Sequence, residues 1–193
     1  MNSYIYNTTL LFKKIFLFLY KYNGVKTFCF FSFLNVPILF FGQKEYKTFY
    51  HANGKVSSEG FWVNNQPDGI WKTYSEKGVL ISVGNRRNGQ LDSMWKFFDQ
   101  KGRLERSIDF KEGKKNGVQS EYDSLGVLIE TVDYRQNLKS GFKRTYYPDG
   151  KLHWLVPFSE NKEDGKAKEY APDGRWISVI KYTMGFIAGV ERF

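Results

Sequence analysis

Apolar, polar and turn-forming positions recur along this chain with a fixed period. From Tyr46 onward the sequence divides, without insertion, into six blocks of 24 residues and a partial seventh: 46–69, 70–93, 94–117, 118–141, 142–165, 166–189 and 190–193. The ninth position is glycine in every block, the fifth is aromatic, the eleventh is apolar, and the twentieth is Asn or Gly. Self-similarity at a fixed period indicates a repeat architecture.

The constant residues predict two turns in each block. Gly and Asn tolerate positive φ, so the ninth and twentieth positions are expected to turn the chain. Pro148-Asp149-Gly150 shows the chemistry of a type I turn followed by a left-handed glycine. Between the turns lie segments of strand length such as 70–74 and 103–110. We therefore expect an all-β protein, an extended single-layer β-meander of six tandem 24-residue β-hairpins.

Period-two alternation assigns side chains to the faces of this sheet. It predicts that the eleventh, fifteenth and seventeenth positions share one face, as in Leu104-Ile108-Phe110, Leu128-Val132-Tyr134 and Trp176-Ile180-Tyr182. Basic residues recur at the third position and are expected on the side of the fifth-position aromatic: Lys72, Lys96, Arg144 and Lys168.

Three aromatic residues at even positions are expected opposite the fifth-position aromatics: Trp71, Trp95 and Phe97. One interpretation is an exposed aromatic patch, which often marks an interface. The other is that a bulge or a curl of the sheet turns these side chains inward as core. The sequence leaves both open, and we take the three residues as candidate partner contacts, together with the apolar last turn that begins at Thr183.

The first 43 residues form a leader of different composition. Residues 27–42 are an uncharged apolar run behind four lysines, and a membrane-spanning helix needs about 20 such residues. The run therefore fits the hydrophobic region of a signal peptide, with cleavage near Gly42 or Gln43 and export to the periplasm or cell surface. The alternative is an uncleaved membrane anchor over 27–42.

Charge and composition narrow the function classes. The formal charge is +9, but the leader carries four lysines and no acid, so the rest holds 25 basic and 20 acidic residues, or +5. This mild excess is not the signature of a nucleic-acid-binding protein. His51 and His153 occupy different repeat positions, and no phosphate-binding loop or metal-ligand spacing occurs. We expect a non-enzymatic protein without cofactor or metal.

Two segments resemble a known repeat family. EGFWVNNQPDGIWKTYSEKGVL at 59–80 and GFKRTYYPDGKL at 141–152 are similar to the variant form of the membrane occupation and recognition nexus (MORN) repeat. Its pattern of turn, aromatic and leucine positions is filled here by Asn65, Asp68, Gly69, Trp71, Tyr74, Gly78 and Leu80. The resemblance implies a flat or curled β-meander used for protein or lipid contact. Bacterial proteins of this variant often carry the name YwqK-family antitoxin.

The expected function is that of an exported scaffold for protein–protein interaction. A surface that binds carbohydrate through its aromatic rings is one alternative. Attachment to acidic lipid through the third-position basic residues is another. The simpler explanation for those basic residues is structural: their aliphatic stems lie across neighbouring tyrosine rings while the charges stay in water.

Overall fold

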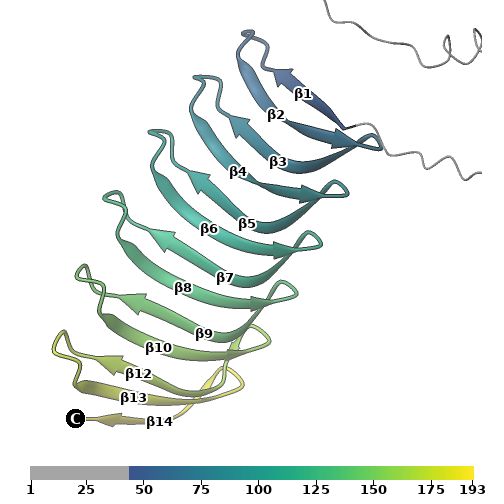
Figure 1. Cartoon of the computed structure of the whole chain (residues 1–193). Coiled ribbons are helices and arrows are strands. Elements are labelled where there is room, and N and C mark those ends of the chain that lie inside the picture. Colours follow the sequence, from purple (N-terminus) through teal and green to yellow (C-terminus); the bar gives the residue numbers. More distant parts are fainter. Residues whose placement is uncertain (1–43) are drawn as a thin grey trace, which may run out of the picture. The chain divides into compact units, whose positions relative to one another are not determined.

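A computed structural model describes residues 44–193, and this part of the chain forms one antiparallel sheet with no helix (Figure 1). Strands adjacent in sequence are adjacent in the sheet, except that β12 follows β10 and the short β11 pairs with β10 alone. The expected all-β meander is thereby confirmed. The strands are β1 (Glu45–Tyr50), β2 (Val56–Val63), β3 (Gln66–Tyr74), β4 (Leu80–Arg87), β5 (Gln90–Phe98), β6 (Leu104–Lys111), β7 (Lys114–Tyr122), β8 (Leu128–Arg135), β9 (Leu138–Tyr146), β10 (Leu152–Ser159), β11 (Lys162–Glu163), β12 (Gly165–Tyr170), β13 (Trp176–Thr183) and β14 (Phe186–Arg192).

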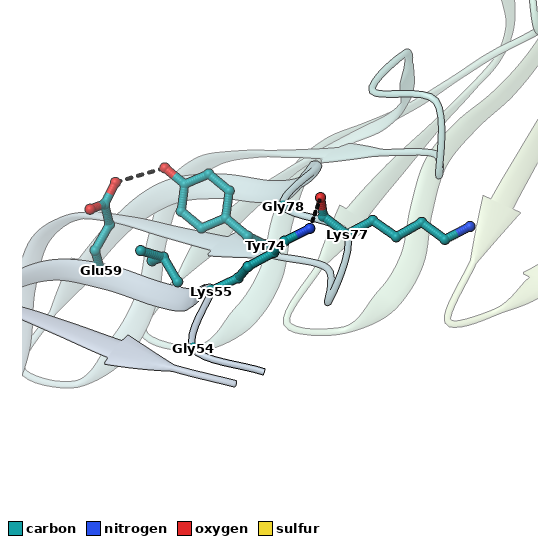
Figure 2. Close-up of a pocket in the computed structure, with 7 residues that line it drawn as sticks. Gly54, Lys55, Glu59, Tyr74, Lys77 and Gly78 are labelled. Carbon is teal, nitrogen blue, oxygen red and sulfur yellow. Dashed lines mark hydrogen bonds between the residues drawn. The ribbon is translucent and has the colours of Figure 1, made fainter. Parts of the chain in front are cut away.

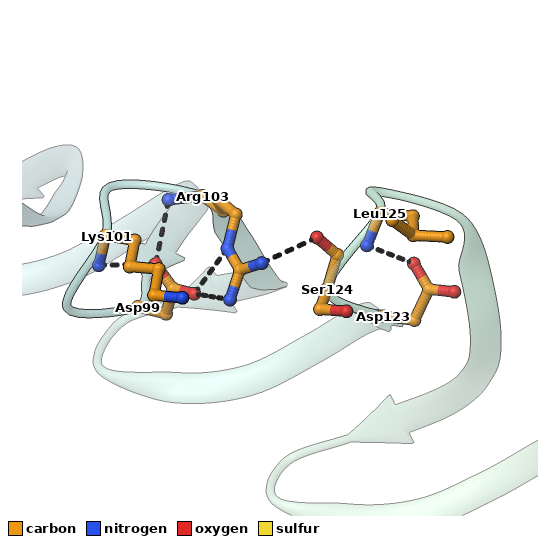
Figure 3. Close-up of polar contacts among 6 residues, drawn as sticks. All are labelled: Asp99, Lys101, Arg103, Asp123, Ser124 and Leu125. Carbon is orange, nitrogen blue, oxygen red and sulfur yellow. Dashed lines mark hydrogen bonds and ion pairs between the residues drawn. The ribbon is translucent and has the colours of Figure 1, made fainter.

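The longer turns carry the ninth-position glycines. In the third block Gly102 has a φ of 78° and its N–H donates to the Asp99 carbonyl at 3.0 Å. The Asp99 carboxylate accepts further bonds from the Lys101 and Arg103 N–H groups at 2.8 and 2.9 Å. The Arg103 guanidinium then donates to the Ser124 carbonyl in the next turn at 2.9 Å (Figure 3). Successive turns are thus tied to one another along this edge.

The shorter turns have positive φ at both central residues, which is the type I′ geometry that suits a twisted two-residue hairpin. Asn64 and Asn65 show φ values of 50° and 61°. From the second block onward each such turn also bonds to the block before it; the Gly89 N–H, for example, donates to the Pro67 carbonyl at 2.8 Å. The predicted turns at the ninth and twentieth positions are both confirmed.

A bulge interrupts the register after the longer turn of every block. In the third block Phe98 pairs with Leu104 but Phe97 pairs with Arg106, so Glu105 has no partner. The bulged strand therefore does not keep its period-two alternation through this point. The prediction that Leu104 shares a face with Ile108 and Phe110 was wrong for this reason, and the same correction applies to Leu128 and Trp176.

Side-chain contacts identify the two faces of the sheet. Tyr74 Oη donates to Glu59 Oε1 at 2.7 Å, and Glu59 is the cross-strand neighbour of Lys72. Likewise Lys168 Nζ lies 4.4 Å from the ring centre of Trp176. The first, third, fifth, eleventh, fourteenth and sixteenth positions thus form one face, which we call the tyrosine face. The second, fourth, thirteenth, fifteenth and seventeenth form the other, the tryptophan face. The predicted sharing of a face by the third and fifth positions is confirmed.

On the tyrosine face Ser107, Thr131 and Val179, all at the fourteenth position, are buried. The largest buried side chains form a second cross-strand row, along the middle of the tryptophan face. Second and fifteenth positions alternate in it, as Trp95 beside Ile108 and Gln119 beside Val132 show. Trp95 is 2% exposed and Val132 3%. Such burial in a one-layer sheet requires neighbouring side chains to crowd over the row. The strands are visibly bent (Figure 1).

The leader lies outside the described residues, and so do the apolar run 27–42 and the expected cleavage near Gly42 or Gln43. Residues 44–193 contain no helix that is long and apolar enough to cross a membrane.

Candidate functional site

The three candidate contacts lie together on the tryptophan face but differ in burial. Trp71 and Trp95 are 7% and 2% exposed, whereas Phe97 is half-buried. For the two indoles the structure therefore supports the core interpretation over the exposed patch. A partner could reach Phe97 directly, but it could touch the indoles only after the sheet rearranged.

Glycine explains how a one-layer sheet buries two tryptophans. A Cβ added at Gly60 would overlap the ring of Trp71, and a Cβ added at Gly84 would overlap the ring of Trp95. Each indole thus lies flat over a glycine of the preceding strand. Trp95 Nε1 also donates to the Asn85 carbonyl at 2.7 Å. The Trp–Gly pairs are structural devices of the fold.

Aromatic rings and cations extend outward from these indoles. Phe49, Trp62 and Trp71 form a cluster with ring centres 6.1 to 6.5 Å apart, and Lys47 Nζ lies 4.5 Å from the centre of the Trp62 ring. A cation near the face of a ring is attracted by its quadrupole. This cluster belongs to the N-terminal end of the sheet.

The tyrosine face presents an exposed apolar row that sequence reasoning missed. The first position of five successive blocks is apolar and between 40% and 52% exposed: Tyr46, Ile70, Met94, Val118 and Phe142. The sequence alone could have revealed this row, because blocks two to five each begin with a large apolar residue. The prediction used the fifth and eleventh positions, whose residue type is constant, and so overlooked the first position.

A basic row runs beside this apolar row. Within residues 44–193, Lys72, Lys96 and Lys168 form no ion pair, whereas Arg144 bonds to Asp133 at 3.1 Å. The rows lie two residues apart on the same face, so the tyrosine face offers apolar and positive groups side by side over several repeats.

The tyrosine face also holds a cavity of about 500 Å³ at its N-terminal end (Figure 2). Val56, Glu59 and Tyr74 line it together with the lysines Lys55 and Lys77. Burial, and then the bond to Glu59, raise the pKa of Tyr74 to about 12. Tyr74 therefore stays a neutral hydrogen-bond donor at physiological pH.

The remaining candidate, the apolar last turn, leads into an exposed strand. Every residue of β14 is exposed, with Phe186 at 78% and Ile187 at 62%. Within residues 44–193 no group of three His, Cys, Asp or Glu side chains is placed to hold a metal ion.

Comparison with known proteins finds a similarity to a known family at the N-terminal end of the array. The family model described as the MORN repeat variant matches residues 46–64 and 67–88. The resemblance to this repeat is confirmed over those residues. No curated protein matches the chain.

Among solved structures, one match is a chain of the GtfA/B complex bound to UDP and GlcNAc. The sequences are 15% identical and the TM-score is 0.28. The match covers 82% of this chain and 27% of that one, so this chain spans about a quarter of that chain's length.

Proposed function

We propose that residues 46–193 are a non-enzymatic scaffold that binds a protein partner along the tyrosine face, within an exported protein. One observation carries the proposal. Five consecutive repeats expose a large apolar side chain on this face, and in two of them a lysine without an ion pair within residues 44–193, Lys72 or Lys96, lies two residues further on. These apolar residues recur once in each repeat, with Asn85, Asp109 and Asp133 between them, and such a regular series differs from the scattered single residues of an ordinary surface.

The repeat geometry supports a partner that is elongated. Two strands of about 4.8 Å each separate equivalent residues of neighbouring blocks, so the five-residue row extends roughly 40 Å. A partner with an apolar edge flanked by acidic residues would complement both rows. The name YwqK-family antitoxin adds no support, since no residue of this chain shows toxin neutralisation.

Affinity capture by the native protein tests the proposal. Ile70→Glu/Met94→Glu places charges in the apolar row, and we expect it to abolish capture of the partner. Leu125→Glu is the matched control, because Leu125 is 86% exposed in a turn and belongs to neither row. The proposal fails if no partner is captured, or if both variants retain or lose it equally.

The lysines favour acidic lipid as a second candidate. Lys72, Lys96 and Lys168 on one face could add electrostatic attraction to apolar insertion. Binding to liposomes should then rise with anionic lipid and fall with salt. Liposome binding that changes with neither anionic lipid content nor salt would exclude acidic lipid as the ligand. Carbohydrate has less support, since the exposed indole of the tyrosine face, Trp176, has Lys168 Nζ 4.4 Å from its ring centre.

The proposal that the protein is exported rests on the apolar run of the leader at 27–42. N-terminal sequencing of the native protein tests it: a start near Gly42 or Gln43 is expected. An intact leader would favour the membrane-anchored alternative.

A further inference from the structure

The tryptophan face holds two arginines whose charges have no carboxylate partner within the described residues. Arg86 Cζ lies 5.4 Å from the centre of the Trp95 ring, and Arg106 Cζ lies 5.3 Å from that of Phe97. Neither forms an ion pair with residues 44–193. In both, the Nε atom is buried without a hydrogen-bond partner in that part of the chain. Arg86 Nη1 donates to the Gly89 carbonyl at 2.7 Å, so the described part of the chain replaces part of its hydration but supplies no negative charge to either guanidinium.

Two lysines add positive charge to this face: Lys115, in the same block as Arg106, and Lys139, in the next block. Lys115 Nζ lies 4.8 Å from the centre of the Tyr134 ring, and Lys139 Nζ lies 5.2 Å from that of Phe158. Burial lowers the pKa of Lys115, the nearby charges of Arg106 and Lys139 lower it further, and the charge of Glu121 opposes them. The cations of successive blocks are thus close enough to repel one another.

Carboxylates on this part of the face offset little of the charge. Glu130 is paired with Lys143 at 2.8 Å. Glu121 is the cross-strand neighbour of Arg106, but it accepts the Gln119 amide at 2.9 Å and forms no ion pair within residues 44–193. Four cations therefore face one unpaired carboxylate, and the surface lacks negative charge.

We propose that the tryptophan face of blocks two to four docks an extended acidic segment of a protein, whose carboxylates are bound by Arg86, Arg106, Lys115 and Lys139. A guanidinium held against an aromatic ring presents its outer edge in a fixed plane, which suits bidentate binding of a carboxylate. Phe97 between the two arginines supplies apolar contact. This site lies on the opposite face from the proposed scaffold surface and does not depend on it.

Spacing argues for an extended peptide over a small anion. Lys115 and Lys139 occupy the same repeat position in neighbouring blocks and are separated by two strands, or roughly 10 Å, whereas Arg86 and Arg106 occupy the seventeenth and thirteenth positions. One small carboxylate cannot span that distance. An extended chain advances about 3.3 to 3.6 Å per residue, so acidic residues at every third position match the repeat. The leader is not the occupant, since residues 1–43 contain no acid.

Fluorescence anisotropy on the full chain tests the site with a labelled peptide that carries glutamate at every third position between Gly and Ser. We expect binding that weakens with salt. The same peptide with glutamine in place of glutamate should not bind. Because this comparison changes only the peptide, it holds even where a protein variant fails to fold.

Protein variants then locate the site. Arg86→Gln/Arg106→Gln should weaken binding roughly tenfold or more, and Arg86→Lys/Arg106→Lys should restore part of it. Arg175→Gln is the matched control, since its side chain is 82% exposed in a turn, and it should bind as the unmodified chain does. The proposal is overturned if the glutamate peptide does not bind, if the glutamine peptide binds equally, or if Arg175→Gln is as damaging. Binding of single-stranded oligonucleotide in place of the peptide would also overturn it.

Discussion

The first and second halves of the repeat array fill the same central row of the tryptophan face in different ways. In the first half a glycine lies beneath an indole, at Gly60–Trp71 and Gly84–Trp95. Further along the array a β-branched residue stands beside a more flexible one: Ile108–Gln119 and Val132–Lys143. The fold therefore constrains the combined volume of the two side chains in each cross-strand pair. It does not fix the size of either side chain by itself.

Removing an indole should give the largest effect. Trp95→Ala leaves a cavity that the sheet cannot refill, and we expect a loss of about 3–5 kcal/mol in the free energy of unfolding. Urea denaturation measures it. Trp176→Ala is the control, because Trp176 is 48% exposed and should lose much less. Equal losses would mean that the central row has no special place in the core.

Filling the glycine site should give the next largest effect. Gly84→Ala forces the ring of Trp95 to move, and overpacking of this kind costs about 1–3 kcal/mol. Gly189→Ala is the matched control, since nothing lies within 4 Å of its added Cβ and its φ is not positive. Thermal unfolding of both variants checks the difference. A Gly84→Ala protein as stable as the control would contradict the close Trp–Gly contact.

One block departs from the others at its last position, and repairing it should stabilise the protein slightly. Ser93 has a φ of 59°, where Gly69, Gly117 and Gly141 stand in other blocks. A left-handed conformation costs a non-glycine residue about 1–2 kcal/mol. Ser93→Gly should therefore raise stability, by up to about 1 kcal/mol after the greater entropy of the unfolded chain is counted. A loss of stability in denaturant titration would show that the Ser93–Asp92 hydrogen bond outweighs the strain.

The smallest effect concerns the tyrosine face. Tyr74 should titrate near pH 12, because burial and the bond to Glu59 raise its pKa in the folded protein to about 12 from the ordinary tyrosine value of about 10. The neutral form is favoured by folding, so this contribution to stability is present below pH 10 and is lost as pH rises from about 10 to 12. Tyrosinate absorbance follows the ionisation. Glu59→Gln should lower the pKa of Tyr74, and an unchanged titration would exclude the hydrogen bond as a cause.

Period and turn chemistry predicted the strands and turns, because Gly and Asn report positive φ directly. The face of Leu104 was mispredicted, since the unpaired Glu105 changes the phase of the strand and leaves no trace in an alternation count. The burial of the tryptophans could have been inferred: Gly60 and Gly84 occupy the fifteenth position, where the later blocks have Ile or Val. The arginine site depends on which cations lack partners, and that requires three-dimensional contacts.

A double-mutant cycle tests the shared volume of the central row most directly. Gly84→Ile and Trp95→Gln together convert this pair into the Ile108–Gln119 pair of the next block. We predict that each single variant loses roughly 2 kcal/mol or more in the free energy of unfolding. The double variant should lose less than the sum by about 1–3 kcal/mol. Additive losses would contradict the claim that the two positions are filled as a pair.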